Sequence, residues 1–137
     1  DYAPILTDGN GRLHTRSKGN KSYTSEVSYV SAVTVSGSGG THTGATITND
    51  PNISYYFFEH NFSGSGVSYV IEASIDNSTF FDLSTSGLIF NDPSTPSVAN
   101  QAINQLNDFV YPFFRLKFTN SNASSRDINL SYITITE

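Results

Sequence analysis

The chain has 137 residues, a length typical of one domain that can bury a sizeable core. It contains no cysteine, which excludes disulfides, thiolate metal sites and cysteine nucleophiles. The formal net charge is −5, and no apolar run is long enough to span a membrane, so we expect neither a nucleic-acid nor a membrane partner. The missing cysteines and the lack of a signal segment favour assembly in a reducing cytoplasm.

Basic residues concentrate at the start of the chain. Four of the seven lie in the first 21 positions, namely Arg12, Arg16, Lys18 and Lys21. This segment has a net charge of about +2, whereas the remainder has about −7. Such a cluster can be a solvated face, but it also suits an extended arm that grips an acidic partner surface.

Residues 1–26 predict a hairpin and an arm. The turn residues Asp8 to Gly11 separate Ile5 and Leu6 from Leu13, and Asp-Gly and Asn-Gly favour tight hairpins. Residues 16–25 are polar and basic, without a core pattern. We therefore divide the chain into an arm over 1–26 and a domain over 27–137.

The first half of the domain predicts strands separated by turns. A β-branched strand covers 27–36 and ends at the glycines of 37–40, and a weaker strand covers 43–48. Residues 53–62 are apolar on both faces, which is typical of a central strand or of one that faces a partner. Gly64-Ser65-Gly66 then predicts a hairpin turn.

The next segment contains the clearest alternation in the chain. From 67 to 75 the predicted inward residues are Val67, Tyr69, Ile71, Ala73 and Ile75. Asp76-Asn77-Ser78 predicts a turn into a strand at 80–83, and a short apolar strand follows at 87–90.

The last third begins with an ambiguous segment. Residues 97–108 have apolar positions at spacings of three and four, so they predict a short helix or a long connection. Strands at 113–119 and 128–136 close the fold as a strand pair. The apolar phase shifts between Tyr132 and Ile133, which indicates a bulge or a two-sided strand.

These elements predict an all-β fold. About eight strands with turns every 8–12 residues are typical of an antiparallel β-sandwich or jelly roll, here with an extended N-terminal arm.

Catalytic and metal motifs are missing from the sequence. His14, His42 and His60 are scattered, so we interpret them as surface or hydrogen-bonded residues and expect no metal. Glu59 and His60 are neighbours on a strand and point to opposite faces. Glu59 and Glu72 could form a carboxylate pair across a cleft, or both could face solvent. We expect no enzyme activity and no cofactor.

Two further patterns have alternative interpretations. The aromatics Tyr55, Tyr56 and Phe58 could face a glycan or a protein partner, but core packing is the alternative for most of this run. Triplets of the N-x-S/T type, for instance at Asn20, Asn61 and Asn122, fit chance in a chain rich in Asn, Ser and Thr.

Three segments carry a resemblance to bacteriophage virion proteins with β-sandwich domains. Residues 4–15 (PILTDGNGRLHT) resemble an opening hairpin of such proteins, 70–83 (VIEASIDNSTFFDL) resemble their strand–turn–strand, and 112–118 (PFFRLKF) resemble the strand that follows. The resemblance implies a structural role without a cofactor, on phage heads as a cement or decoration protein, or on tails, baseplates or fibres.

The first hypothesis is therefore a capsid decoration or cement protein, assembled in the host cytoplasm and located in the virion. Its partners would be the major capsid protein or itself, as a homotrimer or dimer. The alternative is a receptor- or carbohydrate-binding module of a tail, fibre or baseplate. A hydrolase that uses Glu59 and Glu72 remains only a formal third hypothesis.

Overall fold

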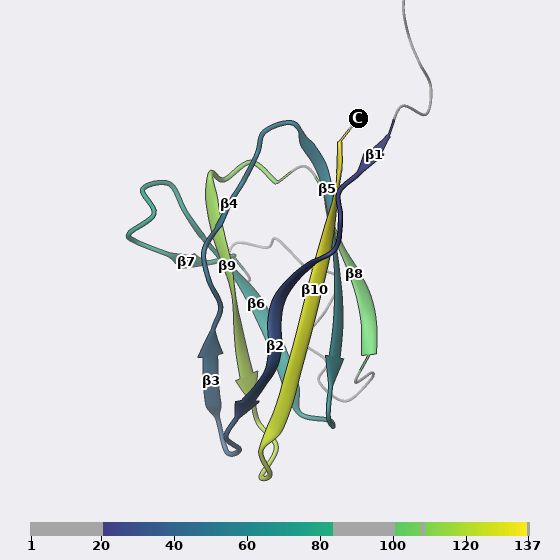
Figure 1. Cartoon of the computed structure of the whole chain (residues 1–137). Coiled ribbons are helices and arrows are strands. Elements are labelled where there is room, and N and C mark those ends of the chain that lie inside the picture. Colours follow the sequence, from purple (N-terminus) through teal and green to yellow (C-terminus); the bar gives the residue numbers. More distant parts are fainter. Residues whose placement is uncertain (1–20, 84–100, 108, 137) are drawn as a thin grey trace, which may run out of the picture.

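A computed structural model describes residues 21–83, 101–107 and 109–136. These residues form strands and no α-helix, and the strands make two antiparallel sheets that pack face to face (Figure 1). The first sheet, called the β10 sheet, consists of β1 (Ser22–Tyr23), β2 (Val27–Val35), β5 (Ile53–Phe62), β8 (Gln101–Asn107) and β10 (Arg126–Thr136). The second, called the β9 sheet, consists of β3 (Gly40–Thr43), β4 (Ile47–Thr48), β6 (Val67–Ser74), β7 (Phe81–Asp82) and β9 (Phe113–Asn120). The predicted antiparallel β-sandwich is confirmed.

The order of the strands differs from their order in the chain. Across the β10 sheet it is β2, β10, β5 and β8, and β1 pairs with the last residues of β10 on the same side as β2. Across the β9 sheet it is β3, β9, β6 and β7, and β4 continues the edge that β3 begins. The chain therefore passes repeatedly from one sheet to the other.

The core lies between the two sheets and follows from period-two alternation along the central strands. Every second residue of β9 is buried, and Phe114, Leu116 and Phe118 have no exposed surface. Ile128 and Leu130 of β10 meet them from the opposite sheet, within one continuous apolar cluster. Burying each such side chain contributes about 1.5–3 kcal/mol, so the alternation is the main source of stability.

The alternation predicted for 67–75 is confirmed up to the end of β6. Val67, Tyr69, Ile71 and Ala73 are buried. Ile75 lies one residue beyond the strand and is exposed, so this one inward assignment is wrong. The predicted turn begins there: the Asp76 carboxylate accepts the backbone N–H groups of Ser78 and Thr79 at 2.9 and 2.8 Å.

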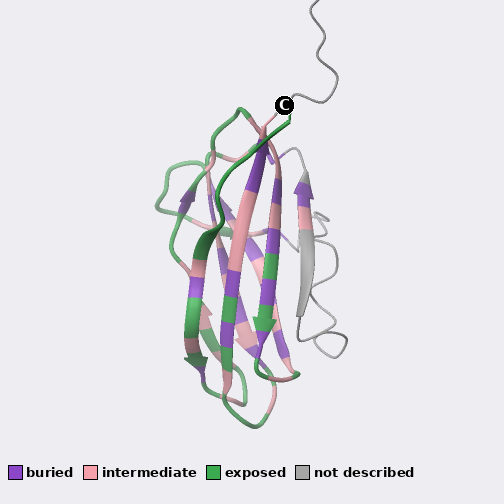
Figure 2. Cartoon of the chain, turned by 45° about the vertical axis from the view of Figure 1, so that its right-hand side comes forward, coloured by how far each residue is buried: buried purple, intermediate pink, exposed green. Residues whose placement is uncertain are grey.

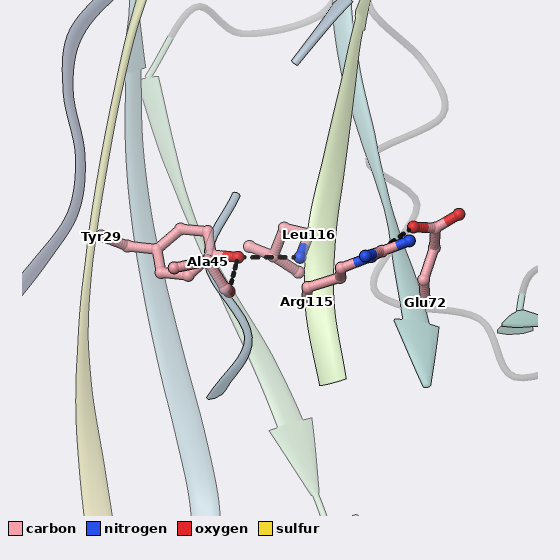
Figure 3. A network of polar contacts seen from close by, with 5 residues as sticks. All are labelled: Tyr29, Ala45, Glu72, Arg115 and Leu116. Atoms are coloured by element: carbon pink, nitrogen blue, oxygen red, sulfur yellow. Dashed lines mark hydrogen bonds and ion pairs between the residues drawn. The ribbon is translucent and has the colours of Figure 1, made fainter. Parts of the chain in front are cut away.

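Tyr29 of β2 ties the two sheets together (Figure 3). Its hydroxyl donates to the carbonyl of Ala45 at 2.5 Å and accepts the N–H of Leu116 in β9 at 3.1 Å. Burial raises the pKa of Tyr29 to about 12, because a phenolate would lose its water, and the bond from Leu116 offsets part of that rise. A Cβ on Gly44 would overlap the Tyr29 ring, so a glycine is needed where the ring crosses.

Two predicted hairpins are instead connections between sheets. The turn at Gly64–Gly66 joins β5 to β6, and these strands belong to different sheets. Likewise β9 and β10 follow each other closely in the chain but do not pair. Short turns after apolar strands favour hairpins locally, but here burial of both strands against opposite sides of one core decides their positions.

The helix or connection predicted for 97–108 is also wrong over its described part. Residues 101–107 form β8, which pairs with β5 in a continuous antiparallel register from Gln101 opposite Asn61 to Asn107 opposite Tyr55. The edge of β5 offers a row of unpaired backbone groups, and pairing with it outweighs a weak helical period.

The predicted bulge lies elsewhere. The register of β10 with β5 runs unbroken through Tyr132 and Ile133, so these residues belong to a two-sided strand, which was the alternative. Two irregularities fall between β10 and β2, and at the first of them Ser31 and Ala32 stand opposite the single residue Asn129. Ala32 has φ 49°, and its N–H donates to the Asn129 side-chain oxygen at 2.8 Å.

The described ends of the chain lie together at one pole of the sandwich (Figure 1). Ser22 pairs with Thr136 and Tyr23 with Ile135. Three polar turns meet at the other pole: Ser38 N–H donates to Asn122 O at 2.7 Å, and Ser121 N–H donates to Gly66 O at 2.9 Å. No helix in the described residues is long and apolar enough to cross a membrane.

Candidate interaction surface

The outer face of the β10 sheet carries an apolar strip. Ile133 of β10 lies opposite Phe57 of β5, and Ile135 lies opposite both Tyr55 and Tyr23. Tyr55, Phe57 and Ile133 point away from the core, because their strand neighbours Tyr56, Phe58 and Tyr132 pack into or against it. Tyr23 is exposed beside them, whereas Ile135 is only 5% exposed. Figure 2 views this sheet, with β10 and β5 at its centre. The outer faces of a sandwich are usually polar, so an apolar strip on such a face is a candidate interaction surface.

A groove borders the strip. It has a volume of about 150 Å³ and is lined by Glu26, Phe57, Glu59, Ser131, Tyr132 and Ile133. Glu26 and Glu59 are exposed, so two carboxylates stand beside an apolar floor. No basic residue is among these described lining residues. We call this feature the acidic groove.

Of the four predicted basic contact residues, the structure describes Lys21 alone. Its ammonium lies 5.8 Å from the centre of the Tyr55 ring, at the edge of the apolar strip. Arg12, Arg16 and Lys18 lie outside the described residues, and so do the predicted hairpin before them and the predicted strand at 87–90.

The aromatic residues predicted to face a partner divide between the two sides of β5. Tyr55 lies on the outer face, and its contact with a partner stays a prediction. Tyr56 and Phe58 are 2% and 0% exposed and pack against Phe114 of the opposite sheet, so a surface role for these two is wrong and core packing is correct. Tyr56 also donates a hydrogen bond to the Asn49 side-chain oxygen at 2.6 Å, and burial raises its pKa to about 12.

The outer face of the β9 sheet is polar by comparison. Arg115 of β9 and Glu72 of β6 form an ion pair with Nε and Oε1 2.8 Å apart (Figure 3). The Arg115 guanidinium also lies 3.8 Å from the centre of the Phe80 ring. Around Arg115, this face is therefore taken up by contacts within the chain.

The possible catalytic pair is not formed. Glu59 and Glu72 project from the outer faces of different sheets, with the core between them. His60 points the other way from Glu59, as predicted, and is buried with its Nδ1 3.0 Å from the Tyr69 hydroxyl. His42 lies beside Phe118 at the sandwich edge, and His14 is outside the described residues. Among the described residues, no three His, Asp or Glu side chains gather as a metal site would require.

A second apolar area lies at the β6–β7 end of the β9 sheet. Ile75 and Phe81 are exposed there and border a cavity of about 330 Å³ that reaches Tyr111. Asp82 is the one ionisable side chain besides Tyr111 among its described lining residues. The side chains of this area are less regularly spaced than those of the strip, because β6 and β7 pair over only two residue pairs.

Sequence reasoning missed Ile133 and Glu26 as surface residues of interest. The signal was present in part: both 53–62 and 128–136 are apolar at odd and even positions. A two-sided strand indicates either burial on both faces or one face with a partner, and only the register of β10 with β5 places the outward residues of the two strands side by side.

No protein-family model matches the chain, and no curated protein matches it. Among solved structures, it is similar to VP2 of infectious bursal disease virus, seen in a subviral particle, with a TM-score of 0.53 and 12% identity. The match covers 100% of this chain and 38% of VP2, so the chain spans little more than a third of that protein.

Two looser likenesses are a pilus protein of Bacillus endospore appendages and the PBSX exported protein XepA. Their TM-scores are 0.41 and 0.38, their identities 11% and 17%, and the matches cover 91% and 96% of this chain. They cover 97% of the pilus chain and 43% of XepA. The likeness to VP2 establishes that this chain shares its β-sandwich fold with part of a viral protein.

Proposed function

We propose that this chain is a non-enzymatic structural protein of a bacteriophage virion, and specifically a decoration or cement protein that binds the lattice of the major capsid protein. The observation that carries the proposal is the apolar strip on the outer face of the β10 sheet. A surface of this kind suits permanent contact with another protein, since apolar side chains gain stability when a partner removes them from water.

The order of the strands supports the proposal. Strands β2, β10, β5 and β8 face β3, β9, β6 and β7, with the chain alternating between the sheets. We interpret this as a jelly-roll connection, which recurs in viral capsid and lectin domains. The three sequence segments that resemble phage virion proteins agree with it, and so does the fold shared with VP2.

The test is immunogold electron microscopy of virions from the phage that encodes the chain, with antibodies raised against the purified protein. Gold on the head surface at regular density would support decoration. Gold confined to the tail would contradict decoration and support a tail, fibre or baseplate module instead. Particles without label, with all the protein in the soluble fraction, would overturn the structural role itself.

The alternative is a receptor- or carbohydrate-binding module of a tail, fibre or baseplate. One observation favours it: Tyr55 and Phe57 present aromatic rings on an outer face, and Glu59 stands next to them in the acidic groove. Aromatic rings beside a hydrogen-bond acceptor are chemistry that a sugar can use. Binding on a glycan array that is lost in Phe57→Ala, with folding retained, would support this alternative over decoration.

A further inference from the structure

We propose that the acidic groove receives the basic N-terminal segment of a second copy of this chain, so that copies are linked arm to groove. This inference concerns self-association and does not depend on which virion component the chain binds.

The first argument is charge. The groove presents the exposed carboxylates of Glu26 and Glu59 and no base among its described lining residues. The segment before β1 carries Arg12, Arg16 and Lys18. Arg16 and Lys18 are two residues apart, so an extended chain would point both cations to the same side.

The second argument is size and polarity. A cavity of about 150 Å³ is smaller than the pockets that enclose drug-sized molecules, and it suits one side chain. Its floor includes Phe57 and Ile133, so the part of the side chain that enters it should be apolar. Arg16 and Lys18 each combine an apolar stem with a cationic head, which matches an apolar floor between carboxylates.

The third argument is direction, and it favours a second copy over the same chain. In β1, Tyr23 pairs with Ile135 and Ser22 with Thr136, so the chain followed back from Tyr23 to Lys21 runs toward the end of β10 and away from Ile133. The twenty residues before Lys21 can span up to roughly 65–70 Å when extended, which is ample to reach a neighbouring molecule. Lys21, beside Tyr55, lies where the segment would leave its own sandwich.

The experiment compares two charge reversals in the full chain by sedimentation equilibrium. Glu59→Lys alters the groove, and the double variant Arg16→Glu/Lys18→Glu alters the arm. Each should weaken self-association by about tenfold or more, because attraction becomes repulsion. Mixing the two variants should restore association, since the intact arm of the first fits the intact groove of the second. Asp127→Lys is the control: it reverses a charge on the same outer face of β10, outside the groove, and should leave association unchanged.

The outcomes decide between clear alternatives. A wild-type chain that stays monomeric over roughly a hundredfold range of concentration would overturn the proposal. So would association that both variants leave intact, or a loss that also occurs in Asp127→Lys. Circular dichroism of each variant confirms that the sandwich is retained. Because no capsid is present, a negative result here leaves the decoration proposal to its own test.

Discussion

Tyr29 and Leu116 join the two sheets through one hydrogen bond, with the Leu116 N–H donating to the Tyr29 hydroxyl at 3.1 Å. The same hydroxyl donates to Ala45, so one side chain holds β2, β9 and the segment between β3 and β4 in fixed relation. The Leu116 carbonyl accepts the Gly44 N–H at 2.9 Å, while the Leu116 N–H is satisfied by the tyrosine hydroxyl and not by a neighbouring strand.

Removal of the Tyr29 hydroxyl should therefore destabilise the sandwich. Tyr29→Phe leaves the Leu116 N–H and the Ala45 carbonyl without this partner, so we expect a loss of about 1–3 kcal/mol in the free energy of unfolding. Urea denaturation followed by circular dichroism measures it. Tyr132→Phe is the matched control, because Tyr132 contacts Tyr29 through its ring, and its hydroxyl shows no hydrogen bond to the described residues. Equal losses in both variants would contradict the bridging role.

Stability should also fall in alkaline solution. Tyr29 and Tyr56 have a pKa of about 12 in the folded chain against about 10 for a free tyrosine. Because the folded pKa is raised, this contribution is complete below pH 10 and is lost as the pH rises from 10 towards 12. The urea midpoint should thus decline over that interval. A Tyr29→Phe/Tyr56→Phe double variant should show a shallower decline, and an unchanged slope would count against the burial of these hydroxyls.

The bulge in β2 should tolerate glycine better than alanine. Ala32 has φ 49°, a left-handed conformation that costs a non-glycine residue about 1–2 kcal/mol. Glycine removes that cost but loses more entropy on folding, so Ala32→Gly should stabilise the chain by about 0.5–1 kcal/mol. Ala45→Gly, at an exposed position outside this conformation, should instead be neutral or destabilising. Thermal denaturation of both variants distinguishes the two signs.

The two faces of β5 should respond differently to truncation. Phe58→Ala removes a fully buried ring and should cost about 3–5 kcal/mol. Phe57→Ala trims a half-exposed ring on the apolar strip, so its cost should be about 1 kcal/mol. Co-sedimentation with empty capsids should show lost binding for Phe57→Ala despite its retained fold. If Phe57→Ala were the more destabilising of the two variants, the assignment of the faces would be wrong.

Sequence alone predicted the class of the fold and many of its strands, because period-two alternation records which side chains meet a core. Residues 67–73 are the clearest case, since polar residues separate nearly every buried one. It also predicted that 53–62 serves two faces, and here Tyr56 and Phe58 proved to be core while Tyr55 and Phe57 are outside.

What the sequence could not show was which strands are neighbours. A turn such as Gly64–Gly66 has the same composition whether it folds a hairpin or passes between sheets. For that reason the turn predicts β5 and β6 as neighbours, which would bring Glu59 and Glu72 onto one sheet. The strand at 101–107 was hidden for a related reason, since its identity depends on the edge of β5 rather than on its own side chains. The candidate surface was the hardest part to predict, because Ile133 and Phe57 are 76 positions apart and only the register of β10 with β5 makes them neighbours.

Ser22 beside Thr136 has a further consequence for how such a molecule can be used in an assembly. Whatever is joined to the chain on either side of the described sandwich emerges from one pole, while the polar turns at Ser38, Gly66 and Asn122 occupy the other. A body attached in this way has a base and a tip. A second domain fused at the base would leave the tip unobstructed, and substitutions at the tip would lie at the opposite pole from the pairing of β1 with β10.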